Sequence, residues 1–158
     1  MKIIDNKLLD SLSVRACNNP RLRVNYNFHD SLEDPINRLL NAMEPGTYVP
    51  PHRHSNPNRD EIFLVLRGKI AMFIFNDDGT VRTTFEMSPE LEVKGMEIEA
   101  GVWHSLVVLE SGTVLYEIKN GPYVPLSPEN LASWAPDINN QREIDNYTNK
   151  LLEIFTSR

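Results

Sequence analysis

The sequence predicts an all-β core, a sandwich or barrel of short strands, with a helical segment at each end of the chain. All seven glycines lie between Gly46 and Gly121, and glycine typically marks tight turns. The segments between these glycines are short and rich in β-branched and aromatic residues, which is typical of strands. Both flanks lack glycine and carry apolar residues at helical spacing.

Length and composition indicate a single folded domain. The chain has 158 residues, of which 41% are hydrophobic and 24% charged, so wholesale disorder is excluded. Within this domain we expect an N-terminal arm of residues 1–45, a β core of residues 46–121 and a C-terminal extension of residues 122–158. No apolar run approaches the roughly 18 residues needed to cross a bilayer, and the charged start of the chain does not resemble a secretory signal. We therefore expect a cytoplasmic protein without a membrane partner.

Charge and cysteine content narrow the classes of function. The formal net charge of −6 argues against a nucleic-acid partner, which requires clustered basic side chains. Cys17 is the only cysteine, so the sequence excludes an internal disulfide and any thiolate-rich metal site. We therefore expect the partner to be a small-molecule substrate or ligand.

The N-terminal arm begins with a predicted helix. Asp5 is suited to the N-cap position, because its carboxylate can accept a hydrogen bond from a free N–H of the first turn. Leu8, Leu9 and Leu12 would lie on one face of this helix, and Pro20 limits its length.

A strand with two different faces follows this helix. Residues 23–29 alternate polar and apolar side chains with a period of two, which predicts a strand. Its apolar face carries Val24, Tyr26 and Phe28, and its polar face carries Arg23, Asn25, Asn27 and His29. The next segment, residues 36–43, fits a helix and a strand equally well.

The β core contains five predicted strands. They span residues 61–66, 70–75, 81–87, 102–109 and 113–118. The sequence Asn76-Asp77-Asp78-Gly79 is typical of a hairpin turn between the second and third of them. Short strands at this spacing are typical of an all-β sandwich or barrel.

The C-terminal extension begins as an extended, proline-containing segment and ends in a predicted helix over residues 139–155. Its apolar residues at helical spacing are Ile144, Tyr147, Leu151, Leu152 and Phe155. We expect this apolar stripe to pack on the β core, and a contact between two copies in a homodimer is the alternative.

Two histidines separated by one residue predict a metal site. In an extended strand, residues i and i+2 point to the same side, so His52 and His54 can bind one ion. Glu61 can add a carboxylate oxygen, and His104, far along the chain, can add a third imidazole. This donor set suits a divalent transition metal, namely iron, manganese, nickel, copper or zinc. The alternative is a pair of surface histidines without a metal.

These residues stand in a pattern that resembles the two motifs of the cupin superfamily. The first motif is matched by Gly46, His52, His54, Glu61 and Gly68, and the second by Gly95, Gly101 and His104. The resemblance implies a jelly-roll β-barrel, carrying the N-terminal arm and the C-terminal helical extension. It also implies a metal inside the barrel whose four ligands are His52, His54, Glu61 and His104.

The spacing within the first motif departs from the usual one. Six residues separate His54 from Glu61, more than is usual in cupins, so Asp60 is the alternative carboxylate ligand. The distance to Gly68 matches the motif for Glu61, which we therefore prefer.

A narrower resemblance extends over nearly the whole chain. The polar strand of residues 23–29, the sequence Tyr48-Val49-Pro50-Pro51-His52-Arg53-His54 and the late Trp134-Ala135-Pro136 are similar to the WbuC-type cupins. These small bacterial proteins are associated with O-antigen polysaccharide gene clusters. The resemblance implies a role in surface polysaccharide biosynthesis, but it implies no particular reaction.

The polar face of the strand at residues 23–29 is a candidate substrate site. Arg23, Asn25 and Asn27 offer hydrogen bonds to a sugar or a carboxylate, and Tyr48 offers a further one. His29 is the candidate catalytic acid or base, because an unperturbed imidazole titrates near neutral pH. The alternative is that this face is exposed to water and has no function.

Three functions remain open. The first is a metal-dependent enzyme, such as an isomerase, an epimerase or a dioxygenase, that acts on a small polar substrate such as a sugar or sugar nucleotide. The second is a non-catalytic cupin that binds a small ligand or regulates a partner, because one fold hosts both enzymes and binding proteins. The third is a purely structural metal, which we favour least because a core of this size needs no metal to fold.

Overall fold

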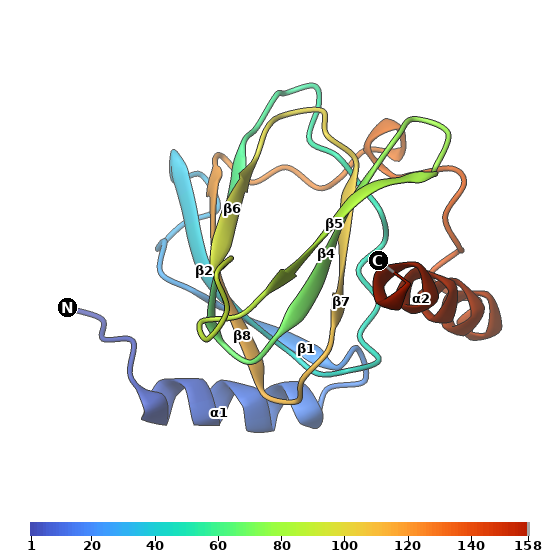
Figure 1. The fold of residues 1–158 in the computed structure, drawn as a ribbon. Helices are drawn as coiled ribbons and strands as arrows, with labels where there is room; N and C mark the ends of the chain where they lie inside the picture. The colour runs from blue at the N-terminus through green and yellow to red at the C-terminus, as the bar shows by residue number, and fades with distance from the viewer. Residues whose placement is uncertain (158) are drawn as a thin grey trace.

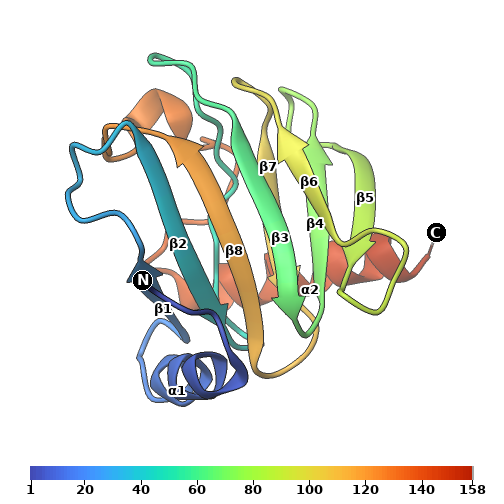
Figure 2. The ribbon, with the colours of Figure 1, turned by 90° about the vertical axis from the view of Figure 1, so that its left-hand side faces the viewer.

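The computed structural model describes residues 1–157 and shows two antiparallel β-sheets that face each other (Figure 1). The larger sheet has five strands, in the order β1 (Arg23–Asn27), β2 (Ile36–Met43), β8 (Thr113–Asn120), β3 (Glu61–Arg67) and β6 (Gly95–Ile98). The smaller sheet has three, in the order β5 (Val81–Met87), β4 (Ile70–Phe75) and β7 (His104–Val108). Figure 2 shows the larger sheet toward the viewer and the smaller sheet behind it.

The predicted all-β core with helical flanks is confirmed. Each predicted strand is present, and the undecided segment of residues 36–43 forms strand β2. The short strand β6 adds to the predicted set. The two facing sheets are consistent with a jelly roll, although no strand pairing within residues 1–157 closes them into a barrel.

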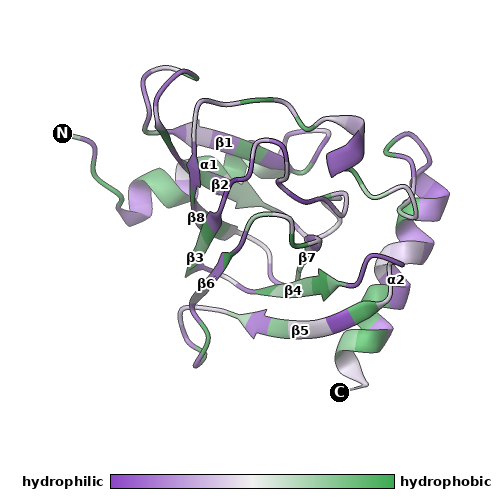
Figure 3. Cartoon of the chain, turned by 90° about the horizontal axis from the view of Figure 1, so that it is seen from above, coloured by the Kyte–Doolittle hydropathy of each residue, from purple (hydrophilic) through white to green (hydrophobic). Residues whose placement is uncertain are grey.

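An apolar core fills the space between the sheets. It is formed by alternate residues of the strands, because successive side chains of a strand point to opposite faces. Its buried members are Met43, Phe63, Val65, Ile70, Met72, Ile74, Met87, Ile98, Leu106, Val108 and Leu115. Strand β4 is buried along its whole length, whereas the edge strand β5 is partly exposed, and Figure 3 shows the same contrast in hydropathy.

The turn between β3 and β4 depends on Gly68. Its φ of +77° lies in the left-handed region that favours glycine. A Cβ at this position would lie 2.8 Å from the Cα of Thr113. Gly68 therefore lets the β3–β4 hairpin pass close to the start of β8.

Helix α1 (Asn6–Cys17) covers the outer face of the larger sheet. The carboxylate of Asp5 accepts a hydrogen bond from the N–H of Leu8 at 2.9 Å, which confirms the predicted N-cap. The buried side chains of Leu9, Leu12 and Ala16 pack against residues of β2 and β8. This contact also buries the apolar face of β1, so the polar face of β1 is turned toward the space between the sheets.

Helix α2 (Gln141–Thr156) packs on the outer face of the smaller sheet, beside β7 in Figure 1. Leu151 and Phe155 contact the cluster that contains Phe73 and Phe75 of β4. The predicted packing of this apolar stripe on the β core is therefore confirmed. Within residues 1–157, none of the helices combines the length and the apolar character that crossing a bilayer requires.

Candidate metal centre

Four side chains that are distant in the sequence converge between the two sheets. His52, His54, Glu61 and His104 each offer one ligand atom, and these four atoms lie within 4.8 Å of one another. The side chains of Glu61 and His104 are almost fully buried. The structure thus brings together the four predicted ligands.

Backbone pairing holds the histidine-bearing segment in place. The N–H of His52 donates to the carbonyl of His104 at 3.0 Å, and the N–H of His104 donates back at 2.9 Å. On the other side of this segment, Arg53 donates to the carbonyl of Asn130 at 3.0 Å and Ala132 donates to that of Pro51 at 3.0 Å. The segment therefore lies as a short extended piece between β7 and the C-terminal extension.

The side chain of Asn130 fixes the chain just after His54. Its Oδ1 accepts hydrogen bonds from the N–H and the hydroxyl of Ser55, at 3.0 and 2.8 Å. Its Nδ2 donates to the carbonyl of Ser55 at 2.7 Å. Asn130 is buried and is the last residue of the 3-10 helix η1 (Pro128–Asn130). The C-terminal extension thus positions a segment that belongs to the metal centre.

Glu61, rather than Asp60, faces the cluster. Glu61 opens β3 and is paired with Ile98 and Lys119 across the sheet. The neighbouring Asp60 points the other way, and its carboxylate accepts a hydrogen bond from the N–H of Ala100 at 2.9 Å. The six residues between His54 and Glu61 contain a turn, which absorbs the unusual spacing.

The hydrogen bonds of two histidines set their tautomers. Nδ1 of His52 lies 2.9 Å from the carbonyl of Pro50, and Nδ1 of His104 lies 2.9 Å from that of Val102. A carbonyl oxygen can only accept, so each Nδ1 carries a hydrogen, and in the neutral ring each Nε2 keeps a lone pair. A backbone carbonyl in this position is the usual outer partner of a metal-binding histidine.

The buried Nε2 of His104 shows whether a cation fits between the four side chains. Nε2 of His104 has no hydrogen-bond partner among residues 1–157 and lies 3.3 Å from Oε2 of Glu61. A lone pair and a carboxylate oxygen at this distance repel each other unless a cation lies between them. The side chains therefore fit a bound metal ion.

The protonation states also suit metal binding. Burial and the neighbouring His104 lower the pKa of His52 well below its usual value, so the ring is neutral. Burial alone would raise the pKa of Glu61, but the Lys119 ammonium group and the nearby imidazoles outweigh it and hold that pKa well below its usual range. Neutral imidazoles and an ionised carboxylate are the forms that bind a divalent transition metal, and iron, manganese, nickel, copper and zinc all accept this donor set.

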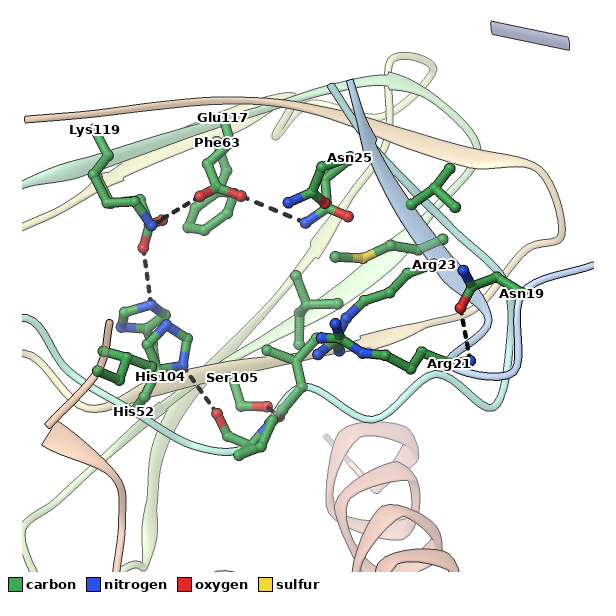
Figure 4. A pocket seen from close by; sticks show the side chains of 18 of the residues that line it. Asn19, Arg21, Arg23, Asn25, His52, Phe63, His104, Ser105, Glu117 and Lys119 are labelled. Atoms are coloured by element: carbon green, nitrogen blue, oxygen red, sulfur yellow. Dashed lines mark hydrogen bonds and ion pairs between the residues drawn. The ribbon is translucent and has the colours of Figure 1, made fainter. Parts of the chain in front are cut away.

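The metal centre forms one wall of a cavity of about 600 Å³ (Figure 4). Its lining includes three of the four ligands, all except His54. Two of the predicted substrate-binding residues, Arg23 and Asn25, also line it. The predicted polar face of β1 is therefore turned toward the same cavity as the metal centre.

The other predicted site residues lie elsewhere. Asn27 is exposed at the end of β1 and does not line the cavity. The hydroxyl of Tyr48 donates to the carbonyl of Pro136 at 3.2 Å, so it anchors the C-terminal extension. His29 is buried, and its Nδ1 accepts a hydrogen bond from the N–H of Arg38 at 3.0 Å. None of the three contacts the cavity, so the roles expected for them gain no support from their positions.

Sequence reasoning missed a charged network beside the metal centre. Lys119 lies 2.7 Å from Oε1 of Glu61 and 2.9 Å from Oε1 of Glu117, and Asn41 donates to Glu117 at 3.5 Å. Figure 4 shows the contact between Lys119 and Glu117 as a dashed line at the side of the cavity where His104 lies. The strand pattern contains a signal for two of them, because Glu117 and Lys119 share the inward register of the buried Leu115.

Glu117 and Lys119 both have pKa values that are shifted from the usual ones. Burial and the charge of Glu61 raise the pKa of Glu117 to about 7, although Lys119 opposes the shift. Burial lowers the pKa of Lys119, but the carboxylates of Glu117 and Glu61 outweigh it, so the pKa lies above its usual value. Lys119 is therefore a permanent cation between two carboxyl groups.

Solved structures with a similar fold support the architecture. KdgF from Halomonas sp. is 16% identical, with a TM-score of 0.52 over 67% of this chain and 84% of that chain. TT1209 from Thermus thermophilus is 20% identical, with a TM-score of 0.53 over 76% of this chain and 97% of that chain. An oxalate oxidase in complex with the substrate analogue glycolate is 15% identical, with a TM-score of 0.51 over 66% of this chain and about half (54%) of that chain.

These likenesses show a shared fold. KdgF and the oxalate oxidase are cupins, so the predicted cupin resemblance is confirmed at the level of fold. The narrower resemblance to WbuC-type cupins is not confirmed by any of these comparisons. No curated protein matches the chain.

One family model matches slightly more than half of the sequence. It covers residues 4–87 and is described as a domain of unknown function, DUF6016. The matched region contains helix α1, strands β1 to β5 and three of the four clustered ligands, while His104 follows it. The chain therefore belongs to the DUF6016 family and has the fold of the cupins.

Proposed function

We propose that this protein is a metal-dependent enzyme that acts on a small polar substrate, such as a sugar or sugar nucleotide, in the cavity between its sheets. The observation that carries the proposal is the convergence of four ligand atoms within 4.8 Å of one another at the wall of that cavity. The ligands would be His52, His54, Glu61 and His104. A divalent metal bound there supplies a Lewis acid for a carbonyl, hydroxyl or water oxygen.

The chain's own residues supply binding and proton transfer. Arg23 and Asn25 provide hydrogen-bond donors on the wall formed by β1. Glu117 is a carboxylate of the cavity that is not among the four clustered ligands, and Lys119 holds it in place. We assign to Glu117 the exchange of a proton with the substrate, which an isomerase or epimerase needs. His29 has no part in this proposal because its ring bonds to the backbone of β2.

The biological setting expected from the narrower resemblance stays a prediction. A role in O-antigen polysaccharide biosynthesis has no support in the geometry of the site. The expected cytoplasmic location and homodimer likewise stay predictions.

Metal analysis of the purified protein tests the first half of the proposal. We expect about one transition-metal ion per chain, and we expect His52→Ala and His104→Ala to remove most of it. His29→Gln is the matched control, because it changes a buried histidine outside the cluster. Equal metal content in all three variants would contradict the proposed site.

Turnover assays test the second half. The metal-loaded protein is incubated with a panel of sugars and sugar nucleotides, with oxygen consumption and NMR of the products as the two measurements. A product that forms only in the metal-loaded protein supports the proposal, and Glu117→Gln should then lose activity while keeping its metal. Binding without any product would favour the non-catalytic alternative.

A further inference from the structure

A second group of charged residues borders the same cavity, away from the metal centre, and two of its three members are exposed. Arg15 of α1, Arg21 of the following turn and Arg23 of β1 all line the cavity. In Figure 4 the side chains of Arg21 and Arg23 enter from one side and their guanidinium groups lie next to each other, whereas His104 and Lys119 lie on the opposite side. The cavity therefore has a metal-binding end and a basic end.

Strand register separates the two ends. Arg23 pairs with Met43, which pairs with Thr113 at the start of β8. Lys119, which contacts Glu61, stands near the other end of β8. Apolar side chains also line the cavity, among them Met43, Val49, Phe63 and Leu106. A ligand that reaches both ends must carry polar groups at each of them.

The arginines of the basic end are not paired with carboxylates. Among residues 1–157, Arg15, Arg21 and Arg23 form no ion pair with a carboxylate, although the chain has 22 acidic residues against 16 basic ones. Arg23 donates one N–H to the carbonyl of Tyr48, which fixes its guanidinium and leaves its other donors free. Burial and the adjacent charge of Arg21 lower the pKa of Arg23 to about 10, with Glu117 offsetting part of the shift.

Neutral donors border the arginine pair. The side-chain oxygen of Asn19 accepts the backbone N–H of Arg21, so its amide N–H groups remain as donors. Asn25 lies two residues beyond Arg23 on the same face of β1 and also lines the cavity. Adjacent guanidinium groups with amide donors beside them match the several acceptor oxygens and the double charge of a phosphate group better than a single carboxylate.

We propose that Arg15, Arg21 and Arg23 form a phosphate-binding subsite, so the substrate is a phosphorylated small molecule whose other end reaches the metal centre. The statement that the bound molecule is a substrate rests on the proposed function. The subsite itself does not require the metal, because the arginines lie at the other end of the cavity from the four ligands.

Binding of inorganic phosphate to the full-length, metal-free protein tests the subsite. Chelator-treated protein is titrated with phosphate at low salt by calorimetry, with succinate as the carboxylate probe. We expect phosphate to bind at least about tenfold more tightly than succinate, and added NaCl to weaken it. Arg21→Gln should weaken phosphate binding by about tenfold or more, the usual size of one lost charge-assisted hydrogen bond. Arg15→Gln should weaken it in the same direction.

Arg142→Gln is the matched control, because Arg142 is exposed on α2, does not line the cavity and has no ion pair among residues 1–157. Phosphate affinity that is unchanged in Arg21→Gln, or that appears only after metal is added, would overturn the subsite. Metal content is measured on the same samples. Phosphate binding by a protein that takes up no metal would support the subsite and contradict the proposed function, so the two can fail separately.

Discussion

Lys119 is the residue on which the electrostatics of the metal centre depend. It separates the carboxylates of Glu61 and Glu117, at 2.7 and 2.9 Å, and its side chain is only 17% exposed. Without it, the buried carboxyl groups of Glu61 and Glu117 would face each other without a cation between them. The ion pairs of Lys119 thus belong to the class whose removal leaves a buried charge unpaired.

Replacing Lys119 should therefore destabilise the metal-free protein strongly. We expect Lys119→Met to lower the free energy of unfolding at neutral pH by about 3 kcal/mol, measured by urea denaturation. Lys69→Met is the control, because Lys69 forms a more exposed ion pair with Glu86, worth about 1 kcal/mol or less. If the two variants lost the same free energy of unfolding, the buried ion pairs of Lys119 would contribute no more to stability than the exposed pair of Lys69.

Tyr48 predicts a pH dependence that is separate from the metal centre. Burial raises the pKa of its phenol from 10.0 to about 12, and the hydroxyl donates to the carbonyl of Pro136. A raised folded-state pKa gives a contribution to stability that is complete below about pH 10 and is lost as the pH rises toward about 12. In Tyr48→Phe the decline of thermal stability over this window should be shallower than in the wild type. Parallel pH profiles would contradict this assignment.

At the scale of elements, the metal centre depends on a segment that carries none of its ligands. Residues 130–132 pair with the chain around His52, and the side chain of Asn130 makes hydrogen bonds to Ser55. This pairing continues the smaller sheet beyond β7 by two short extended pieces. The positions of His52 and His54 are therefore set by the C-terminal extension as well as by β7.

Removing the Asn130 side chain should affect both folding and metal binding. We expect Asn130→Ala to cost about 1–3 kcal/mol, because polar groups of Ser55 lose their buried partners. The affinity for metal should fall as well, which competition with a chelator measures. Asn139→Ala is the control, because Asn139 is exposed and, within residues 1–157, its side chain bonds only to the nearby Asp137. A normal metal affinity in Asn130→Ala would show that His54 does not depend on this anchor.

The packing of each strand explains whether the sequence could predict it. Strands with one dominant pattern, such as β4 and β8, were predicted from their apolar residues. Residues 36–43 were undecided because β2 is covered on both faces, by the core on one side and by α1 on the other, so alternation is lost. The short β6 has only four residues of mixed polarity, which is too little for a pattern.

The residues of the site also fall into two groups, those that sequence spacing predicts and those that only the packing of distant elements brings to the cavity. The four clustered ligands follow from local spacing and from the cupin resemblance, and Glu117 and Lys119 follow from strand register once β8 is recognised. Arg15 and Arg21 could not be predicted, because only the packing of α1 and its following turn against the sheet brings them to the cavity. Sequence spacing contains no information about a contact of that kind.

At the scale of the whole molecule, the apolar core between the sheets is extensive and independent of the four ligands. We therefore expect removal of the metal to leave the protein folded. If the metal is present at about a hundredfold excess over its dissociation constant, its removal should lower the melting temperature by about 5–10 °C. Cooperative thermal unfolding before and after chelation measures this, and complete unfolding of the chelated protein would support a purely structural metal.

Strand order has a consequence for fragments of this chain. Both neighbours of β3, namely β6 and β8, lie beyond residue 87, where the family match stops. A piece cut at that point would leave β3 with two bare edges, whose unpaired N–H and C=O groups recruit strands from other molecules. Such a piece should form insoluble assemblies, which light scattering would detect. Grafting this centre into another protein therefore means transferring the later strands and the tail together with it.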